Sequence, residues 1–149
     1  MNKIIKLLLI MFALQSCSYE PILTKKNYNF QFAEIKYEGE KKINREIERN
    51  LRNFDKGVLR YDIFFKTKKI KEIISSDSKG DPKIYKIKIY IEYIVSNNGE
   101  TILENNTNNQ FTYNNINDKY ELSKYEDNLL KNLSKNISED ILFSLKVLK

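Results

Sequence analysis

Hydrophobic and polar residues alternate with a period of two along four segments of the chain, which predicts four β-strands. These segments cover residues 28–37, 61–74, 85–95 and 101–113. In the first segment the alternation slips near Ala33-Glu34, and such a slip predicts a β-bulge. The third segment alternates most regularly, so we expect it at the centre of the sheet. Asn98-Gly99, just before the fourth segment, predicts a tight hairpin turn.

In two other segments the hydrophobic residues recur every three or four positions, which predicts amphipathic helices. The first helix is expected from Lys41 toward Gly57, with a stripe made of Ile43, Ile47, Leu51 and Phe54. The second is expected from near Ser123 almost to the C-terminus, because Ser123 and Glu126 have the spacing of a capping box. Its stripe should cover the sheet and consists of Leu122, Tyr125, Leu129, Leu133, Ile137, Ile141, Leu145 and Leu148. The order β-α-β-β-β-α predicts an α+β fold, a two-layer sandwich of a four-stranded sheet and two helices.

The first residues of the chain have the pattern of a secretory signal peptide. Lys3 and Lys6 precede an apolar run over 7–14, which is shorter than the roughly 20 residues of a membrane-spanning helix. The next residues, Leu14-Gln15-Ser16-Cys17, resemble the lipobox of bacterial lipoproteins, which implies cleavage before Cys17 and attachment of lipid to it. We therefore expect a lipoprotein signal peptide over 1–16, a lipidated N-terminus and tether over 17–28, and one domain over 29–149. The alternative is an ordinary signal peptide, or a buried segment, with an unmodified cysteine.

The composition argues against several classes of function. The formal net charge is +6, but Lys, Asn and Ile are all abundant, so basicity alone is weak evidence for an anionic partner, and a nucleic-acid partner conflicts with export. The chain has no histidine and one cysteine, which excludes a Ser-His or Cys-His pair and a zinc site built on Cys and His. The acidic pairs Glu126-Asp127 and Glu139-Asp140 are interpreted as a solvated helix face. We therefore expect no enzyme activity, no cofactor and no metal.

The whole pattern resembles the LPS-assembly lipoprotein LptE family, in which a lipobox cysteine is followed by β-α-β-β-β-α. Ser18 stands where that family commonly has glycine. Several short stretches carry the likeness: Cys17-Ser18-Tyr19-Glu20-Pro21 at the opening, Ile43-Asn44-Arg45-Glu46-Ile47 in the first helix, Gly99-Glu100 in the tight turn, and Tyr125-Glu126-Asp127 in the last helix.

The resemblance implies an outer-membrane lipoprotein, anchored on the periplasmic face, that acts as plug and assembly partner of the LptD β-barrel while lipopolysaccharide is transported to and inserted in the outer membrane. It implies one LptE-like domain over 29–149, no catalytic activity, and as partners the barrel, lipopolysaccharide and the membrane. The alternative from another class is an auxiliary lipoprotein of an ABC-type lipid or solute transporter. A lipid-anchored hydrolase is disfavoured by the missing histidine.

Lysines gather near the end of the predicted hairpin between the second and third strands. Because lysine is a point-charge partner for phosphate, we expect weak contact with the phosphates of lipopolysaccharide there. The alternative is that these lysines are ordinary solvated surface. They are Lys66, Lys68, Lys69, Lys71, Lys79 and Lys83.

The fourth strand is unusually rich in asparagine, which is typical of a sheet edge or of a face that meets something other than the core. Barrel lumens are lined by polar side chains, so an Asn- and Tyr-rich exterior suits a protein that lies inside a barrel. Compositional bias toward asparagine is the alternative. The residues expected on this exterior are Asn105, Asn106, Asn108, Asn109, Tyr113 and Tyr90.

Overall fold

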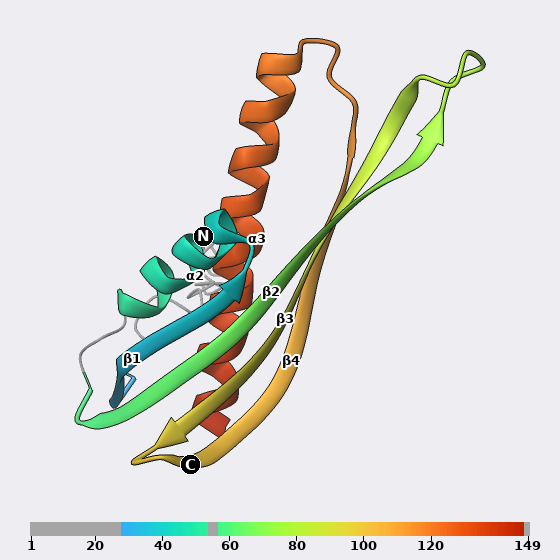
Figure 1. Cartoon of the computed structure of the whole chain (residues 1–149). Coiled ribbons are helices and arrows are strands. Elements are labelled where there is room, and N and C mark those ends of the chain that lie inside the picture. The colour runs from blue at the N-terminus through green and yellow to red at the C-terminus, as the bar shows by residue number, and fades with distance from the viewer. Residues whose placement is uncertain (1–27, 54–56, 148–149) are drawn as a thin grey trace, which may run out of the picture.

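The computed structural model describes residues 28–53 and 57–147, so Cys17, the predicted signal peptide and nearly all of the predicted tether lie outside the described residues. The predicted order β-α-β-β-β-α is confirmed (Figure 1). The elements are β1 (Phe30–Gly39), α2 (Lys41–Arg52), β2 (Leu59–Ser76), β3 (Pro82–Asn97), β4 (Glu100–Asn114) and α3 (Lys119–Val147). Neither described helix is both long enough and apolar enough to span a bilayer.

The four strands form one mixed sheet in the order β1-β2-β3-β4. β1 and β2 run parallel, with α2 as the crossover between them, and the other neighbours are antiparallel. The register between β1 and β2 shifts between Phe32 and Glu34, which confirms the predicted bulge. Asn98 and Gly99 both have positive φ, at 51° and 84°, as a type I′ hairpin turn requires. Both helices cover the same face of the sheet (Figure 1).

One hydrophobic core lies between the helices and the covered face of the sheet. Leu133, Ile137 and Ile141 of α3 are buried in the same cluster as the β3 isoleucines, so the predicted packing of the leucine stripe is confirmed for them. Tyr125, which was also expected in this stripe, is 39% exposed. Phe54 and Leu148, which were expected in the two helical stripes, lie outside the described residues. The sheet contributes Phe30, Phe32, Ile63, Phe65, Ile87, Ile89, Ile91, Tyr93, Val95 and Tyr113 to this core.

A polar junction fixes the turn from β1 into α2. The Thr67 hydroxyl accepts a hydrogen bond from the Glu40 N–H at 3.1 Å and donates one to Asn44 Oδ1 at 2.5 Å. Gly39 has φ +98°, and a Cβ at this position would lie 2.0 Å from the backbone oxygen of Thr67. Only glycine fits here, because the turn needs positive φ and the two backbones touch.

The start of the long helix differs from the prediction. α3 begins at Lys119, and Asp118 Oδ1 accepts hydrogen bonds from the N–H groups of Tyr120 and Glu121 at 2.8 and 2.9 Å. Asp118 is therefore the N-cap, and the predicted start at Ser123 is wrong. The Ser-x-x-Glu spacing lies within the helix, where the backbone N–H groups already have helical partners.

The connection between β2 and β3 is shorter than the predicted loop over 75–83. Both strands continue into it and leave a turn over 77–81, in which Asp77 Oδ1 accepts from the N–H groups of Lys79 and Asp81, each at 2.9 Å. As a result the β2–β3 hairpin projects beyond the helices as an arm (Figure 1).

Candidate functional site

The face of the sheet opposite the helices is open in the described part of the chain. Because side chains alternate between the faces of a strand, β2 and β3 turn one set of residues to the helices and the other set outward. Phe64, Tyr90 and Ile94 are large residues on this outward side, with 38%, 36% and 37% of their surfaces exposed. We call this surface the open face.

The open face is hollowed in two neighbouring places. The larger hollow, of about 690 Å³, includes Phe64, Ile94 and Asn106 in its lining. The smaller, of about 370 Å³, includes Lys68, Ile70 and Tyr90. Lys66 and Glu92, which face each other across the β2–β3 ladder, line both. The open face therefore combines apolar surface with charged groups of both signs.

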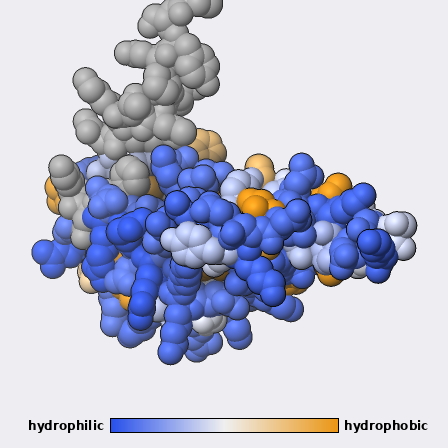
Figure 2. Space-filling view, turned by 90° about the horizontal axis from the view of Figure 1, so that it is seen from above, coloured by the Kyte–Doolittle hydropathy of each residue, from blue (hydrophilic) through white to orange (hydrophobic). Residues whose placement is uncertain are grey.

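Hydrophobic residues also continue onto the projecting arm. Ile73 and Ile74, close to the end of β2, are 57% and 47% exposed. Seen from above, the arm extends to the right of the body, with hydrophobic patches scattered among hydrophilic ones (Figure 2). Scattered apolar residues are normal on a protein surface, so this distribution alone does not define a site.

The structure distributes the predicted lysines over two faces. Lys66 and Lys68 lie on the open face, whereas Lys69 and Lys71 follow the phase of the buried Phe65 and Thr67 and belong to the helix side. Lys79 lies in the turn and Lys83 is the second residue of β3, both exposed. The fold brings only Lys66 and Lys68 together beside the hollows.

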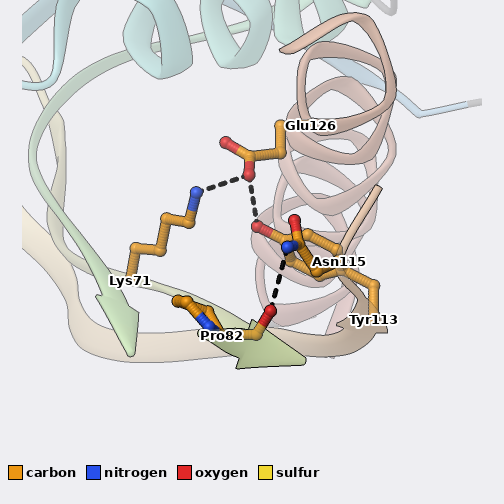
Figure 3. A network of polar contacts seen from close by, with 5 residues as sticks. All are labelled: Lys71, Pro82, Tyr113, Asn115 and Glu126. Carbon is orange, nitrogen blue, oxygen red and sulfur yellow. Dashed lines mark hydrogen bonds and ion pairs between the residues drawn. The ribbon is translucent and has the colours of Figure 1, made fainter. Parts of the chain in front are cut away.

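Lys71 belongs to a network that joins the base of the arm to α3 (Figure 3). The Oε1 atom of Glu126 accepts hydrogen bonds from Lys71 Nζ and from the Tyr113 hydroxyl, both at 2.6 Å. Lys71 Nζ also lies 4.2 Å from the centre of the Tyr85 ring, and that ring stacks on Tyr113 with 5.7 Å between ring centres. Nearby, Asn115 Nδ2 donates to the backbone oxygen of Pro82 at 2.9 Å.

Burial raises the pKa of the Tyr113 phenol well above its ordinary value, and the hydrogen bond to Glu126 raises that pKa further. Only 5% of Tyr113 is exposed, so its predicted place on the exterior is wrong. It has the phase of β4 that faces α3, and its ring closes the core there.

The network also corrects the interpretation of the pair Glu126-Asp127 as a solvated helix face. Glu126 is half-buried with two partners, and Asp127 pairs with Lys42 at the start of α2. Sequence reasoning missed this role, because the partners of Glu126 come from β2 and β4. The sequence offered one local signal for this network. Tyr113 has the phase of the core-facing residues, and a buried tyrosine needs a partner for its hydroxyl.

The asparagines of β4 divide between the two faces as the lysines do. Asn106 and Asn108 point to the open side, opposite Glu92 and Tyr90 of β3, while Asn105 and Asn109 are in phase with Tyr113. Asn105, Asn106 and Asn108 are exposed, and Asn109 is half-buried. Within the described residues no group of three or more acidic or cysteine side chains is arranged to hold a metal ion.

No family model and no curated protein matches the sequence. The fold, however, is similar to that of several solved bacterial proteins. Rare lipoprotein B from Shewanella oneidensis is 15% identical, with a TM-score of 0.58 over 76% of this chain and 94% of that one. A minor lipoprotein from Acinetobacter baumannii is 9% identical, with a TM-score of 0.57 over 77% and 88%. Uncharacterized lipoprotein B from Nitrosomonas europaea is 14% identical, with a TM-score of 0.57 over 76% and 80%. The chain therefore shares its fold with proteins described as lipoproteins.

Proposed function

We propose that this protein is a lipoprotein anchored through Cys17 to the periplasmic face of the outer membrane, where it acts as plug and assembly partner of an LptD-like β-barrel in the transport and insertion of lipopolysaccharide. The observation that carries the proposal is the combination of a lipobox, Leu14-Gln15-Ser16-Cys17, with a fold shared with bacterial lipoproteins. The role is non-enzymatic and needs no cofactor beyond the covalent lipid.

The surface of the domain supports a partner that encloses it. A barrel lumen is lined mainly by polar side chains, and the open face and β4 present amides, lysines and a few apolar residues. The apolar surface of α2 and of the leucine stripe is already buried in the core. The open face therefore remains for contact with the barrel.

Co-purification from solubilised envelopes tests this function. The tagged full-length chain should recover one outer-membrane barrel protein in near-equal amount. Cys17→Ala is the matched control: it should block processing and acylation, and recovery of the barrel should fall because the domain is no longer held at the outer membrane. Recovery of a transporter ATPase or permease, with no barrel protein, would establish the ABC-type alternative instead.

Contact with lipopolysaccharide is the second part of the proposal, and the position of Lys66 and Lys68 beside Tyr90 favours the open face for it. The lysines would meet phosphate groups, while Ile70 and Tyr90, which line the same hollow, would meet acyl chains. Lys66→Glu with Lys68→Glu should weaken lipopolysaccharide binding, and added salt should weaken wild-type binding by screening. Lys69→Glu with Lys79→Glu is the charge-matched control away from the hollows, and it should leave binding intact. Equal loss in both variants would show that binding follows net charge and not the open face.

A further inference from the structure

β4 is an edge strand without the usual protection against pairing. It forms one border of the sheet, beyond which no other described strand is drawn (Figure 1). Exposed edges normally carry charged residues, prolines or bulges that prevent another strand from pairing with them. From Asn105 to Asn114 the chain has no charged residue and no proline, and the register with β3 is continuous over this run.

The hydrogen bonding of Asn106 shows which backbone groups of β4 point outward. Its N–H donates to Asn105 Oδ1 at 2.8 Å, so it is turned away from β3. In an antiparallel pair, alternate residues turn their N–H and C=O groups away from the partner strand. Asn108, Gln110 and Thr112 have the same phase, and their backbone groups therefore form a row along the free edge.

We propose that β4 pairs edge to edge with β4 of a second copy of this chain, antiparallel about a two-fold axis at Asn109. Asn106 then lies opposite Thr112 of the second copy and Asn108 lies opposite Gln110. Glu104, the acidic residue next to the run, lies opposite Asn114, so no like charges meet. The pairing continues the sheet across both copies.

The chemistry of the edge favours a second copy over a different partner. A two-fold interface brings the same surface of each subunit together, so that surface must be complementary to itself. Asn and Gln side chains satisfy this condition, because each carries both a donor and an acceptor. A charged edge would repel its own copy.

A groove on the helix side of β4 can receive side chains of the incoming strand. It has a volume of about 260 Å³, and Phe111, at its rim, is 45% exposed. In the proposed register Phe111 of the second copy lies opposite Thr107, beside this groove. None of the described lining residues is charged; they are Phe111, Tyr125, Asn128, Leu129, Asn132, Leu133 and Asn136.

Two differently tagged copies of the full-length chain, expressed together and purified through one tag, test the proposal. Asn108→Pro removes an outward N–H and no hydrogen bond to β3, so it should leave the fold intact. Recovery of the second tag should fall about tenfold or more, because the change acts twice across the axis. Gln110→Lys places a charge on the same edge and should lower recovery of the second tag in the same way. It provides the test if the proline variant fails to fold. Asn117→Lys, an exposed position beyond β4, is the charge-matched control and should keep wild-type recovery.

Absence of the second tag from wild-type purifications would overturn the proposal, as would recovery that both edge variants leave unchanged. Recovery of a different protein that both edge variants lose, without the second tag, would also overturn it, because the edge would then belong to another partner. The outcome is independent of the barrel proposal, since neither tag requires a barrel protein.

Discussion

Phe64 and Phe65 are adjacent, identical residues on opposite faces of one sheet. Phe65 is fully buried against the helices, whereas Phe64 is 38% exposed beside the larger hollow. The buried part of the covered face is almost entirely apolar. Thr67, its buried polar residue in β2, is held by Asn44 and Glu40. The open face mixes large apolar residues with lysines and asparagines. Similar side chains thus serve the core on one face and remain available for contact on the other.

Among the variants that compare the two faces, Phe65→Ala should lose the most stability. Removing a buried phenylalanine loses its transfer free energy and leaves a cavity, so the free energy of unfolding should fall by about 3–5 kcal/mol. Urea denaturation of the purified chain measures this change. A midpoint close to the wild-type value would show that the covered face is not the core.

Gly39→Ala should have the next largest effect, because it disturbs the junction on which the covered face depends. A Cβ at this position meets the backbone oxygen of Thr67, so strain at positive φ is added to overpacking, and the loss should be about 2–4 kcal/mol. Gly80→Ala is the matched control, since Gly80 also has positive φ but open space around it. The same urea experiment compares them, and equal losses would mean that the contact with Thr67 has no cost.

How far the two faces could be predicted depends on the range of the interactions. Local periodicity identifies the core-facing residues, through the alternation in β2 and the stripe at helical spacing in α3. The strands, the bulge at Ala33 and the buried stripe were therefore predictable. The same alternation already implies that Lys68 and Lys69 lie on opposite faces, although they were interpreted as one cluster.

The roles of Glu126 and Asp118 depend on information that periodicity lacks. Glu126 receives its partners from Lys71 and Tyr113, which are distant in the sequence, so its local appearance is that of an ordinary acidic residue on a helix. Asp118 and Ser123 are both acceptable N-caps by residue type. Only the path of the chain out of β4 decides where α3 begins.

Tyr113→Phe should have a smaller effect, because it removes one hydrogen bond from the covered side and leaves the ring in place. Glu126 keeps Lys71 as a partner, so the loss should be about 1.5 kcal/mol near pH 7. Tyr90→Phe, on the open face, is the control and should change stability little.

This prediction also has a pH dependence. The pKa of Tyr113 is raised in the folded protein, so above about pH 10 the unfolded chain releases a proton that the folded chain keeps. Wild-type stability should therefore fall as the pH rises past 10, and the difference from Tyr113→Phe should shrink. A difference that grows with pH would contradict the buried, neutral phenol.

The smallest loss of stability is expected for Phe64→Ala. Its comparison with Phe65→Ala is the most direct test of how the two faces differ. The side chain keeps contact with solvent in the folded state, so its removal should cost less than about 1 kcal/mol in urea denaturation, several-fold less than Phe65→Ala. If the open face is where the barrel partner binds, the same substitution should reduce recovery of that partner, because a large apolar residue near the centre of an interface contributes more to binding than the residues at its rim. A variant that folds normally and loses the partner would assign Phe64 to contact. A variant as unstable as Phe65→Ala would instead show that the two faces stabilise the sheet equally, and normal stability with full recovery would place the barrel contact elsewhere on the domain.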